Sequence, residues 1–228
     1  MKYLFFTLIV FAIVNCSNEQ SSKSISNLSS FKDSTSYALG ADLGENLRRQ
    51  NVDIDYDVFM AGLTDGMETG LIKLDQKQRR EVMATLQKKL REKADSEGIN
   101  NLKLADEFLK NNKEKDNIKE TPTGLQYRII KEGKGSSPKR EDRVKVHYVG
   151  TLMDGTEFDS SIKRGEPSEF GLTQVIKGWT EGLQLMKLGA KYEFFIHPKI
   201  AYGSRPRPTI PANSLLIFEV ELLDIISK

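Results

Sequence analysis

The C-terminal half of this sequence carries aromatic and aliphatic residues at short intervals. They lie in the segments Val146-His147-Tyr148, Gly155 to Ser161, Gln174 to Trp179, Ala201-Tyr202-Gly203 and Ile210 to Phe218. The carboxylate Asp159 accompanies them, and they include neither a nucleophile–base pair nor a set of metal ligands. This combination predicts a pocket that binds an apolar group and changes its shape without making or breaking covalent bonds.

The two histidines do not alter this interpretation. His147 and His197 are isolated, and both lie in strand-like sequence, which is more typical of partly buried strand residues than of a general base or a metal ligand. No group of histidine, cysteine and carboxylate residues has the spacing of a metal site. The sequence therefore predicts neither a metal ion nor another cofactor.

The elements that must position these side chains form an α+β pattern. Alternation of apolar and polar residues predicts strands at residues 125–130, 143–152, 191–196 and 215–226. Residues 178–186 predict one short helix with Trp179, Leu183 and Met186 on the same side. One helix against several antiparallel strands is an α+β arrangement.

The order and spacing of these motifs closely resemble those of the FKBP-type peptidyl-prolyl cis-trans isomerases, over residues 124–228. The resemblance implies a bent antiparallel sheet wrapped around a short helix, and an enzyme that accelerates rotation about X–Pro peptide bonds. The barrier to this rotation, about 18–20 kcal/mol, arises from lost amide resonance. The twisted amide is less polar than the planar one, so a dry apolar pocket favours it and no residue has to exchange a proton.

The resemblance also implies roles for individual residues. Catalytic roles fall on Tyr148, Phe158, Asp159, Tyr202 and Phe218, and substrate-binding roles on Val175, Ile176, Trp179, Ile210 and Arg164. Trp179 would form the floor, Asp159 and Tyr202 the polar rim, and Ile210 the lip, with the remaining apolar residues as walls. The Tyr202 hydroxyl and the Ile176 backbone amide would orient the bound peptide. The alternative for Trp179 and the apolar walls is a purely structural role in the core, and for Asp159 it is a pairing with Arg164 alone.

Two departures from the family pattern concern the expected ligands. The implied substrates are proline-containing unfolded or exported polypeptides, and macrolides typically inhibit this family. Ser168 stands where many relatives have an aromatic wall residue, and the loop Ser204-Arg205-Pro206-Arg207-Pro208-Thr209 is basic where relatives often use glycines. These changes predict a wider or more polar pocket, and they leave substrate preference and macrolide affinity open.

The residues before this domain predict helices. Apolar residues four positions apart predict helices at residues 37–47, 56–69 and 75–116, with Asp33 to Ser36 capping the first. The third would be about 60 Å long if unbroken, and its single apolar stripe needs a partner surface. Gly98 is the expected place for a bend or break. Gly40 and Gly44 have a spacing that fits either close helix packing or simple tolerance of glycine.

This helical segment resembles the amino-terminal domain of the Mip/FkpA-type isomerases, a bacterial lipoprotein form of the family. The resemblance implies a homodimer in which two copies intertwine through their N-terminal helices and the long helix carries each catalytic domain outward. The predicted organisation is a signal peptide at residues 1–15, a lipidated flexible tether at 16–32, a helical dimerisation domain with its linker helix at 33–120, and an isomerase domain at 121–228.

The N-terminus predicts export to the bacterial cell envelope. Lys2 precedes an apolar run to Val14, which suits a signal peptide better than a membrane-spanning helix of about 20 residues. Cys16 follows this run and predicts cleavage and lipidation, hence a membrane anchor in the outer membrane, at the periplasmic face or at the cell surface. The alternative is a plain secreted or periplasmic protein with a reactive cysteine. The polar stretch after Cys16 predicts a disordered tether.

The charge balance argues against nucleic-acid binding. There are 34 basic and 32 acidic residues, for a net charge of +2, and the basic clusters are interleaved with acids. The leading hypothesis is a membrane-tethered prolyl isomerase, or rotamase, that assists protein folding and also acts as a chaperone. Two alternatives use the same fold for binding alone: a non-catalytic chaperone, and a surface-interaction lipoprotein.

Overall fold

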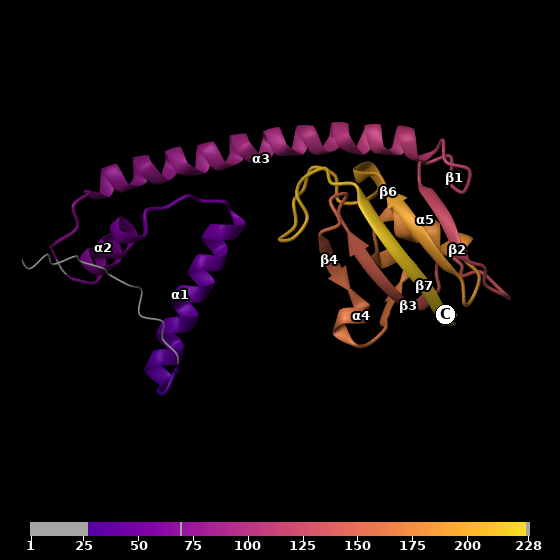
Figure 1. The fold of residues 1–228 in the computed structure, drawn as a ribbon, viewed down its shortest axis with the longest axis horizontal. Coiled ribbons are helices and arrows are strands. Elements are labelled where there is room, and N and C mark those ends of the chain that lie inside the picture. Colours follow the sequence, from indigo (N-terminus) through magenta and orange to yellow (C-terminus); the bar gives the residue numbers. More distant parts are fainter. Residues whose placement is uncertain (1–26, 69, 227–228) are drawn as a thin grey trace, which may run out of the picture. The chain divides into compact units, whose positions relative to one another are not determined.

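The computed structural model describes residues 27–68 and 70–226 (Figure 1). The predicted signal peptide, Cys16 and most of the predicted tether lie outside these residues. The described chain forms two compact units, divided between Asp53 and Ile54. None of the helices in the described ranges is long and apolar enough to cross a membrane.

The first unit contains one helix, α1, which spans Phe31–Arg49. Ser30 is its N-cap: the Ser30 hydroxyl accepts a hydrogen bond from the Asp33 backbone N–H (3.1 Å), and the Asp33 carboxylate accepts one from the Ser30 backbone N–H (3.0 Å). Because this reciprocal pair satisfies two N–H groups that a helix end leaves without partners, the helix begins there. Of the predicted capping residues, Asp33 does cap the helix, from its third position, whereas Ser34, Thr35 and Ser36 lie inside it, so the prediction is wrong for these three. No side chain of α1 is buried.

The second unit begins with two helices that are both capped by aspartate. α2 spans Tyr56–Met67 and has Asp55 as its N-cap, and α3 spans Gln76–Asn112. α3 remains helical through Gly98, so the predicted break there is wrong. Gly98 is buried, and a Cβ atom at this position would lie 3.2 Å from the Cβ of Ala212. The glycine therefore allows the helix to approach another segment closely.

Seven strands in the described ranges form one antiparallel sheet. Their order is β1-β2-β6-β7-β3-β4, and β5 also pairs with β3. The strands are β1 (Lys119–Glu120), β2 (Gln126–Lys131), β3 (Arg143–Thr151), β4 (Glu157–Ser160), β5 (Ser168–Gly171), β6 (Lys191–Ile196) and β7 (Leu216–Ile226). The predicted strands match β2, β3, β6 and β7 to within one residue at each end. β1, β4 and β5 are too short to show a clear alternation.

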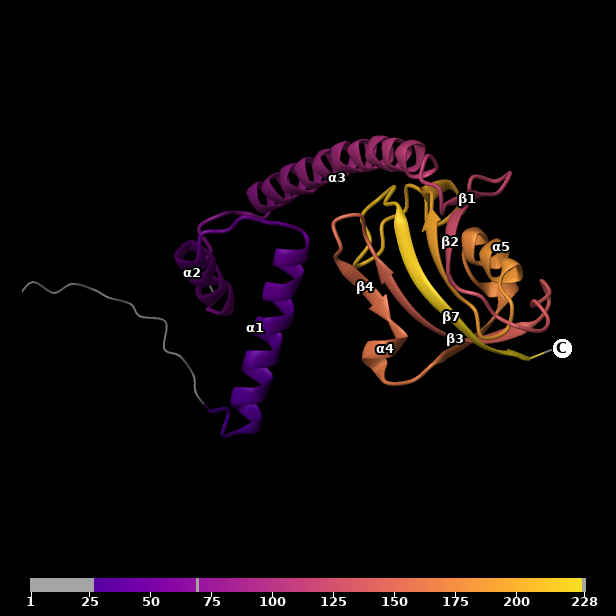
Figure 2. The ribbon, with the colours of Figure 1, turned by 45° about the vertical axis from the view of Figure 1, so that its right-hand side comes forward.

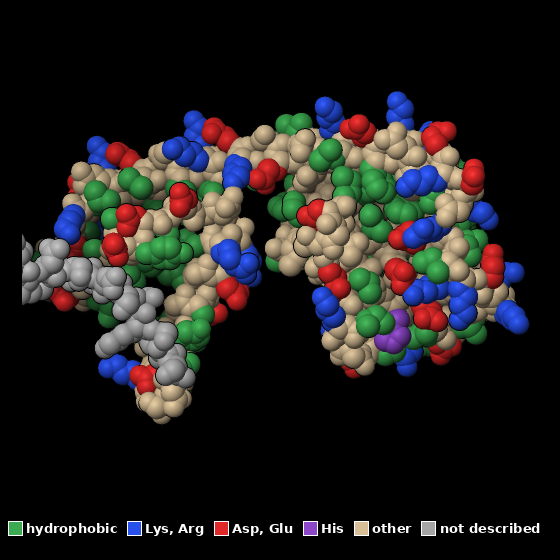
Figure 3. All heavy atoms as spheres, viewed as in Figure 1, with side chains coloured by type: hydrophobic (Ala, Val, Ile, Leu, Met, Phe, Trp, Pro, Cys, Tyr) green, Lys and Arg blue, Asp and Glu red, His purple; other side chains and the backbone are tan. Residues whose placement is uncertain are grey.

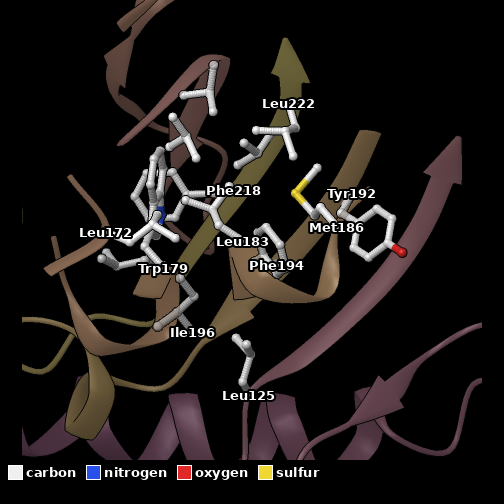
Figure 4. Close-up of a cluster of buried hydrophobic side chains, with 14 of the residues drawn as sticks. Leu125, Leu172, Trp179, Leu183, Met186, Tyr192, Phe194, Ile196, Phe218 and Leu222 are labelled. Carbon is white, nitrogen blue, oxygen red and sulfur yellow. The ribbon is translucent and has the colours of Figure 1, made fainter. Parts of the chain in front are cut away.

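The main core lies between the sheet and α5, which spans Lys177–Leu185 (Figures 2 and 4). The predicted inner side of this helix is confirmed, because Trp179, Leu183 and Met186 are all buried. Gly182 lets the helix approach β6 closely, since a Cβ atom there would lie 2.6 Å from the Phe194 ring. Each apolar side chain that is buried in this way stabilises the fold by about 1.5–3 kcal/mol.

A second, smaller core fixes α3 to the opposite face of β6. Ala105 and Leu109 of α3 pack with Phe195 and Leu215. At the end of the helix, Asn112 Nδ2 donates to Gln126 Oε1 (3.0 Å), and Gln126 Nε2 donates to the backbone carbonyl of Leu109 (2.8 Å). The C-terminal part of α3 is therefore an integral part of the sheet domain.

Candidate active site

The aromatic residues singled out from the sequence meet around Trp179. The ring centroids of Tyr148 and Phe218 lie 5.1 Å and 5.0 Å from that of Trp179, both with their planes nearly perpendicular to the indole. Phe158 makes the same kind of contact with Phe218 at 5.4 Å. Such edge-to-face arrangements are favourable because the positive edge of one ring meets the negative face of the other. β3, β4, α5 and β7 each contribute one member.

The cluster has a buried side and a side that reaches the surface. Trp179, Phe218 and Ile210 are only 5%, 4% and 6% exposed. The half-buried residues that pack against the same core include Tyr148, Phe158, Val175, Ile176 and Tyr202. Trp179 and Phe218 are therefore also core residues, as in the alternative interpretation. The half-buried aromatic and aliphatic side chains that pack against this core are partly exposed to solvent.

A glycine that the sequence analysis did not single out makes this cluster possible. Gly150 lies two positions after Tyr148 on β3, on the same face of the strand. A Cβ atom at Gly150 would lie 2.7 Å from both the Phe158 and the Phe218 ring. Only glycine therefore fits beneath the two rings. A glycine that interrupts the alternation of a strand is a sequence signal of such a close approach.

The polar side of the site is a hydrogen-bonded network around Asp159. The Tyr148 hydroxyl donates to Asp159 Oδ2 at 2.5 Å, and Arg164 forms an ion pair with Asp159 Oδ1. The same guanidinium donates to the Tyr148 hydroxyl and to Ser168 Oγ, both at 3.0 Å. The predicted Asp159–Arg164 pair is present, and it is joined to the aromatic cluster through Tyr148. Ser168 occupies the position where relatives often have an aromatic residue, and its hydroxyl accepts the hydrogen bond from Arg164.

This network fixes the charge of its members. Partial burial opposes ionisation of Asp159, but the hydrogen bonds from Tyr148 and Arg164 outweigh it, so the pKa of the Asp159 carboxyl lies below its ordinary value. Burial, reinforced by the hydrogen bond to Asp159, raises the pKa of the Tyr148 phenol. The site thus holds a carboxylate and a neutral phenol, neither of which is suited to exchange protons near neutral pH.

Tyr148 is positioned by a gap in the pairing of β3. The first half of β3 pairs with β5 as far as Val146, and its second half pairs with β4 from Val149 onward. Ser161, at the start of α4 (Ser161–Arg164), fills the gap: its hydroxyl accepts a hydrogen bond from the Tyr148 backbone N–H (2.8 Å) and donates to the Tyr148 carbonyl (3.3 Å). A single side chain therefore replaces a strand partner for the backbone of Tyr148.

Besides the Nε1–H of Trp179, which is buried without a hydrogen-bond partner, two hydrogen-bond donors beside the cluster have no partner within residues 27–68 and 70–226. One is the Tyr202 hydroxyl, and the other is the backbone N–H of Ile176, which directly precedes α5. The Tyr202 ring is held from one side by Arg207, whose guanidinium carbon lies 5.0 Å from the ring centroid. These are the two groups that the family resemblance assigns to orienting a bound peptide.

A further aromatic member of the cluster, Phe170, is not among the predicted site residues, and neither histidine is assigned a role there. The Phe170 ring lies 5.2 Å from Trp179; its position two residues after Ser168 on β5 was the available signal. His147 is half-buried and contacts Ser161 Oγ through Nδ1 (3.1 Å). In the part of the chain that the structure describes, no three histidine, cysteine or carboxylate side chains are grouped to hold a metal ion. The arrangement can bind and orient an apolar amide, and it offers no nucleophile.

Two family models match this chain. A model described as FKBP-type peptidyl-prolyl cis-trans isomerase matches residues 134–223. A second, described as the domain amino terminal to FKBP-type peptidyl-prolyl isomerase, matches residues 32–129. The two matched regions contain the sheet domain and the helices that precede it.

Individual relatives match most of the chain. The FKBP-type peptidyl-prolyl cis-trans isomerase FkpA of Aeromonas hydrophila is 44% identical over 206 residues, which cover 86% of this chain and 77% of the relative. The outer membrane protein MIP of Legionella longbeachae is 43% identical over 204 residues, which cover 87% of this chain and 88% of the relative. The crystal structure of FkpA from Escherichia coli matches with a TM-score of 0.63 and 35% identity, covering 88% of this chain and 99% of that one.

Proposed function

This chain belongs to the FKBP-type peptidyl-prolyl cis-trans isomerase family, and we propose that it rotates X–Pro peptide bonds at the cluster around Trp179. One observation supports this placement of the site more than any other. Two donors without partners in the described ranges, the Tyr202 hydroxyl and the Ile176 N–H, adjoin half-buried apolar surface on the same core. An X–Pro segment has carbonyl groups for such donors and an apolar ring for such a surface.

The chemistry requires only that the site bind the twisted amide better than the planar one. A planar amide is stabilised by resonance and by water, and both are lost when it enters an apolar surface and turns. Trp179 and Phe218 give the proline ring an apolar floor, while Phe158 and Tyr148 exclude water from the turning carbonyl. Tyr202 and Ile176 hold carbonyl groups of the substrate so that the bond between them can rotate. Each 1.4 kcal/mol or so of preference for the twisted form raises the rate about tenfold.

The Asp159 network has a positioning role in this proposal. Its carboxylate is already bound by Tyr148 and Arg164, so it presents a fixed, charged rim and does not act as a base. The Tyr148 ring, which is part of the aromatic wall, is held in place because its hydroxyl donates a hydrogen bond to Asp159.

The test is a protease-coupled assay on an X–Pro peptide with a matched pair of variants. Tyr202→Phe removes a hydroxyl from the proposed site, and Tyr127→Phe removes one from a half-buried tyrosine that stacks on Tyr192. We expect Tyr202→Phe to lower kcat/KM about tenfold, the value of one hydrogen bond to the substrate, and Tyr127→Phe to leave it unchanged.

A double variant gives the assay its sharpest outcome. Tyr202→Ala combined with Phe158→Ala removes both a donor and an aromatic wall, and we expect isomerase activity to fall close to the uncatalysed rate. Wild-type activity no higher than that of this double variant would exclude catalysis at this site. The non-catalytic chaperone would then be the better account of the fold.

We also propose that α1 and α2 pair with a second copy of the chain, which would give a homodimer with chaperone activity. Neither helix has a buried side chain, although both carry large apolar residues. The exposed ones include Tyr37, Leu39, Leu43, Tyr56, Val58, Met60 and Leu63. Apolar side chains are visible on the surface of this helical region (Figure 3). A surface of this kind needs a partner, and a second copy or an unfolded client polypeptide would provide one.

Light scattering on the chain from Ser17 onward tests the dimer. We expect a mass of two chains at micromolar concentration, and a Leu39→Glu, Leu43→Glu variant should shift it toward one chain. An aggregation assay on an unfolded client polypeptide, carried out with the wild type and with the Leu39→Glu, Leu43→Glu variant, shows whether chaperone activity depends on dimerisation. A single-chain mass for the wild type would contradict the dimer.

We further propose export and lipid anchoring at Cys16 in the cell envelope, an inference that rests on the sequence alone. Mass spectrometry of the protein from a membrane fraction should show a chain that begins at an acylated Cys16. A Cys16→Ser variant should be released from the membrane in a soluble form. A wild-type chain with an unmodified Cys16 would contradict the anchor and leave a secreted or periplasmic protein.

A further inference from the structure

The loop before β7, residues 201–215, carries Tyr202 and Ile210 of the proposed site. A backbone hydrogen bond from the Asn213 N–H to the Gly203 carbonyl (2.8 Å) closes the base of this loop. Asn213 adopts a left-handed backbone conformation there, with φ 55°, which asparagine tolerates better than most residues. The positions of Tyr202 and Ile210 therefore depend on how the base of the loop is held.

Helix α3 holds the base of the loop directly. Asn101 Nδ2 donates a hydrogen bond to the carbonyl of Ala212 (3.0 Å), and Asn213 Nδ2 donates one back to the carbonyl of Gly98 (3.1 Å). At the same place the Gly98 backbone comes so close that a Cβ atom would lie 3.2 Å from the Ala212 Cβ. Figures 1 and 2 show the loop beneath the C-terminal half of α3.

The contact with the loop explains why α3 has a glycine at position 98 and an asparagine at position 101, and helix stability does not. Glycine and asparagine are both weaker helix formers than alanine. From Gln76 to Asn100, Gly98 is the one buried residue of α3. Glycine at position 98 lets the helix backbone reach the loop without displacing it, and the side-chain N–H of Asn101 reaches the Ala212 carbonyl.

A second attachment holds the start of the same segment. His197 precedes the short helix η2 (Pro198–Ile200), and its Nδ1 accepts a hydrogen bond from the Lys199 backbone N–H (3.0 Å). Its Nε2 contacts Asp106 Oδ1 of α3 at 3.0 Å. The chain from His197 to Asn213, which includes Tyr202 and Ile210, is thus joined to α3 at both ends.

We propose that Gly98 and Asn101 are positioning residues of the isomerase site: they hold the base of the loop and, through it, the Tyr202 hydroxyl and the Ile210 side chain. This inference rests on the proposed function. Neither residue touches the substrate. Both lie on a helix outside the sheet, so the site is complete only while α3 is seated on the domain. Groups held in advance in their productive geometry bind the transition state without the cost of ordering them.

The test compares two neighbouring asparagines of α3 in the full chain. Asn101→Ala removes the donor to Ala212, whereas Asn100 is exposed and forms no side-chain hydrogen bond with the described residues, so Asn100→Ala is the matched control. We expect Asn101→Ala to lower kcat/KM for an X–Pro peptide by about three- to tenfold, and Asn100→Ala to leave it unchanged. Hydrogen exchange of the Asn213 amide, which closes the loop, should accelerate only in Asn101→Ala.

A double-variant cycle separates positioning from a general structural effect. If Asn101 acts through Tyr202, its loss should matter less once the Tyr202 hydroxyl is gone. We therefore expect Asn101→Ala to lower kcat/KM by a smaller factor in a Tyr202→Phe background than in the wild type. Equal factors in the two backgrounds would show that Asn101 does not act on the Tyr202 hydroxyl and would overturn the proposal for that group.

A second variant tests the close approach of the helix. Gly98→Ala favours the helix intrinsically but forces the loop to shift by a few tenths of an ångström, whereas Gly62→Ala on α2 meets nothing within 4 Å. We expect Gly98→Ala to lower kcat/KM while the chain stays folded, and Gly62→Ala to leave kcat/KM unchanged.

The possible outcomes separate this inference from the proposed function. An active wild type in which Asn101→Ala and Gly98→Ala behave like their controls would overturn the positioning role alone. Faster exchange of the Asn213 amide with unchanged kcat/KM would do the same, because the loop would then move without consequence for the site. A wild type that is inactive on every X–Pro peptide would overturn the proposed function, and the positioning role with it.

Discussion

The sheet domain buries its apolar residues in a core of its own, whereas the two N-terminal helices leave theirs exposed. Around α5 the sheet closes a core in which Leu183, Phe194 and Leu222 have no exposed surface. α1 and α2 have no buried side chain at all, although Leu39 and Met60 on them are as apolar as the residues of the core. Hydrophobic burial is the main favourable term in folding, so the sheet domain is stabilised by its own residues and the two helices are not.

This difference teaches that one chain can contain two kinds of apolar surface with different purposes. In the sheet domain, apolar residues specify a fold and the geometry of the proposed site. On α1 and α2 they specify the need for a partner, since a helix with an exposed apolar stripe is marginal in water. α3 shares both properties: its N-terminal part is exposed, and from Gly98 onward its residues are built into the sheet domain.

The largest expected effect comes from removing a core side chain. Phe194→Ala should lower the free energy of unfolding by about 3–5 kcal/mol, because a fully buried ring is lost and a cavity remains. Phe31→Ala on α1, where the ring is 88% exposed, is the matched change in the other region, and we expect an effect below about 0.5 kcal/mol on the same transition. Urea unfolding followed by the fluorescence of Trp179, the one tryptophan of the sequence, reads the sheet domain specifically. Equal losses for the two variants would end the contrast between the regions.

A smaller effect is expected where glycine supports the aromatic cluster. Gly150→Ala places a methyl group against the Phe158 and Phe218 rings, and overpacking of this kind costs about 1–3 kcal/mol. Because the same rings line the proposed site, kcat/KM should fall along with the midpoint of unfolding. Full activity in a folded Gly150→Ala protein would show that the two rings can separate without loss, which contradicts their role as a fixed wall.

The same substitution on α1 should have the opposite sign. A Cβ atom at Gly40 meets nothing within 4 Å, and alanine is the better helix former by about 0.8–1.0 kcal/mol. We expect Gly40→Ala to raise the thermal midpoint of the helical signal in circular dichroism and to leave isomerase activity unchanged. A lower midpoint would indicate that the face of Gly40 is covered by another chain, which would decide between packing and tolerance for the Gly40–Gly44 pair.

The fold was largely predictable because its elements have strong local periodicity. β6 and the inner face of α5 followed directly from alternation and from the three-to-four spacing of Trp179, Leu183 and Met186. The break expected at Gly98 was wrong because glycine is also used where two backbones come close, and that requires the position of Ala212, more than a hundred residues away. α1 begins at Phe31 and not at Tyr37 because Ser30 and Asp33 form a reciprocal capping pair, which apolar periodicity does not reveal.

The aromatic cluster of the proposed site was predictable in its members, but the residues that support it were not. The family resemblance gave Trp179 and the aromatic walls, and the structure brings them together. It gave no role for Gly150 or Ser161, because the first depends on the distance between two rings and the second on a gap in strand pairing. Neither property is local in sequence. The link from Tyr148 to Asp159 depends on the register of β3 and β4, which pairs Asp159 with Gly150, two positions from Tyr148.

The smallest expected effects concern acid, because both α1 and the proposed site contain a carboxylate whose pKa is depressed by side-chain hydrogen bonds. In α1 the hydrogen bonds from Ser30 lower the pKa of Asp33; in the site, burial of Asp159 is outweighed by hydrogen bonds from Tyr148 and Arg164. A depressed pKa contributes stability that is present above the unfolded-state value of about 3.9 and is lost as the pH falls through the folded-state value. We therefore expect kcat/KM and the helical circular dichroism signal to be constant above pH 5 or so and to decline below about pH 4.

Two variants test whether each decline has its own carboxylate. Asp159→Asn should weaken the decline in kcat/KM and leave the decline of the helical signal unchanged. Asp33→Asn should weaken the decline of the helical signal and leave the decline in kcat/KM unchanged. If either variant altered both declines, protonation of one region would affect the other. The two regions would then differ in how they bury apolar residues, but they would not titrate independently.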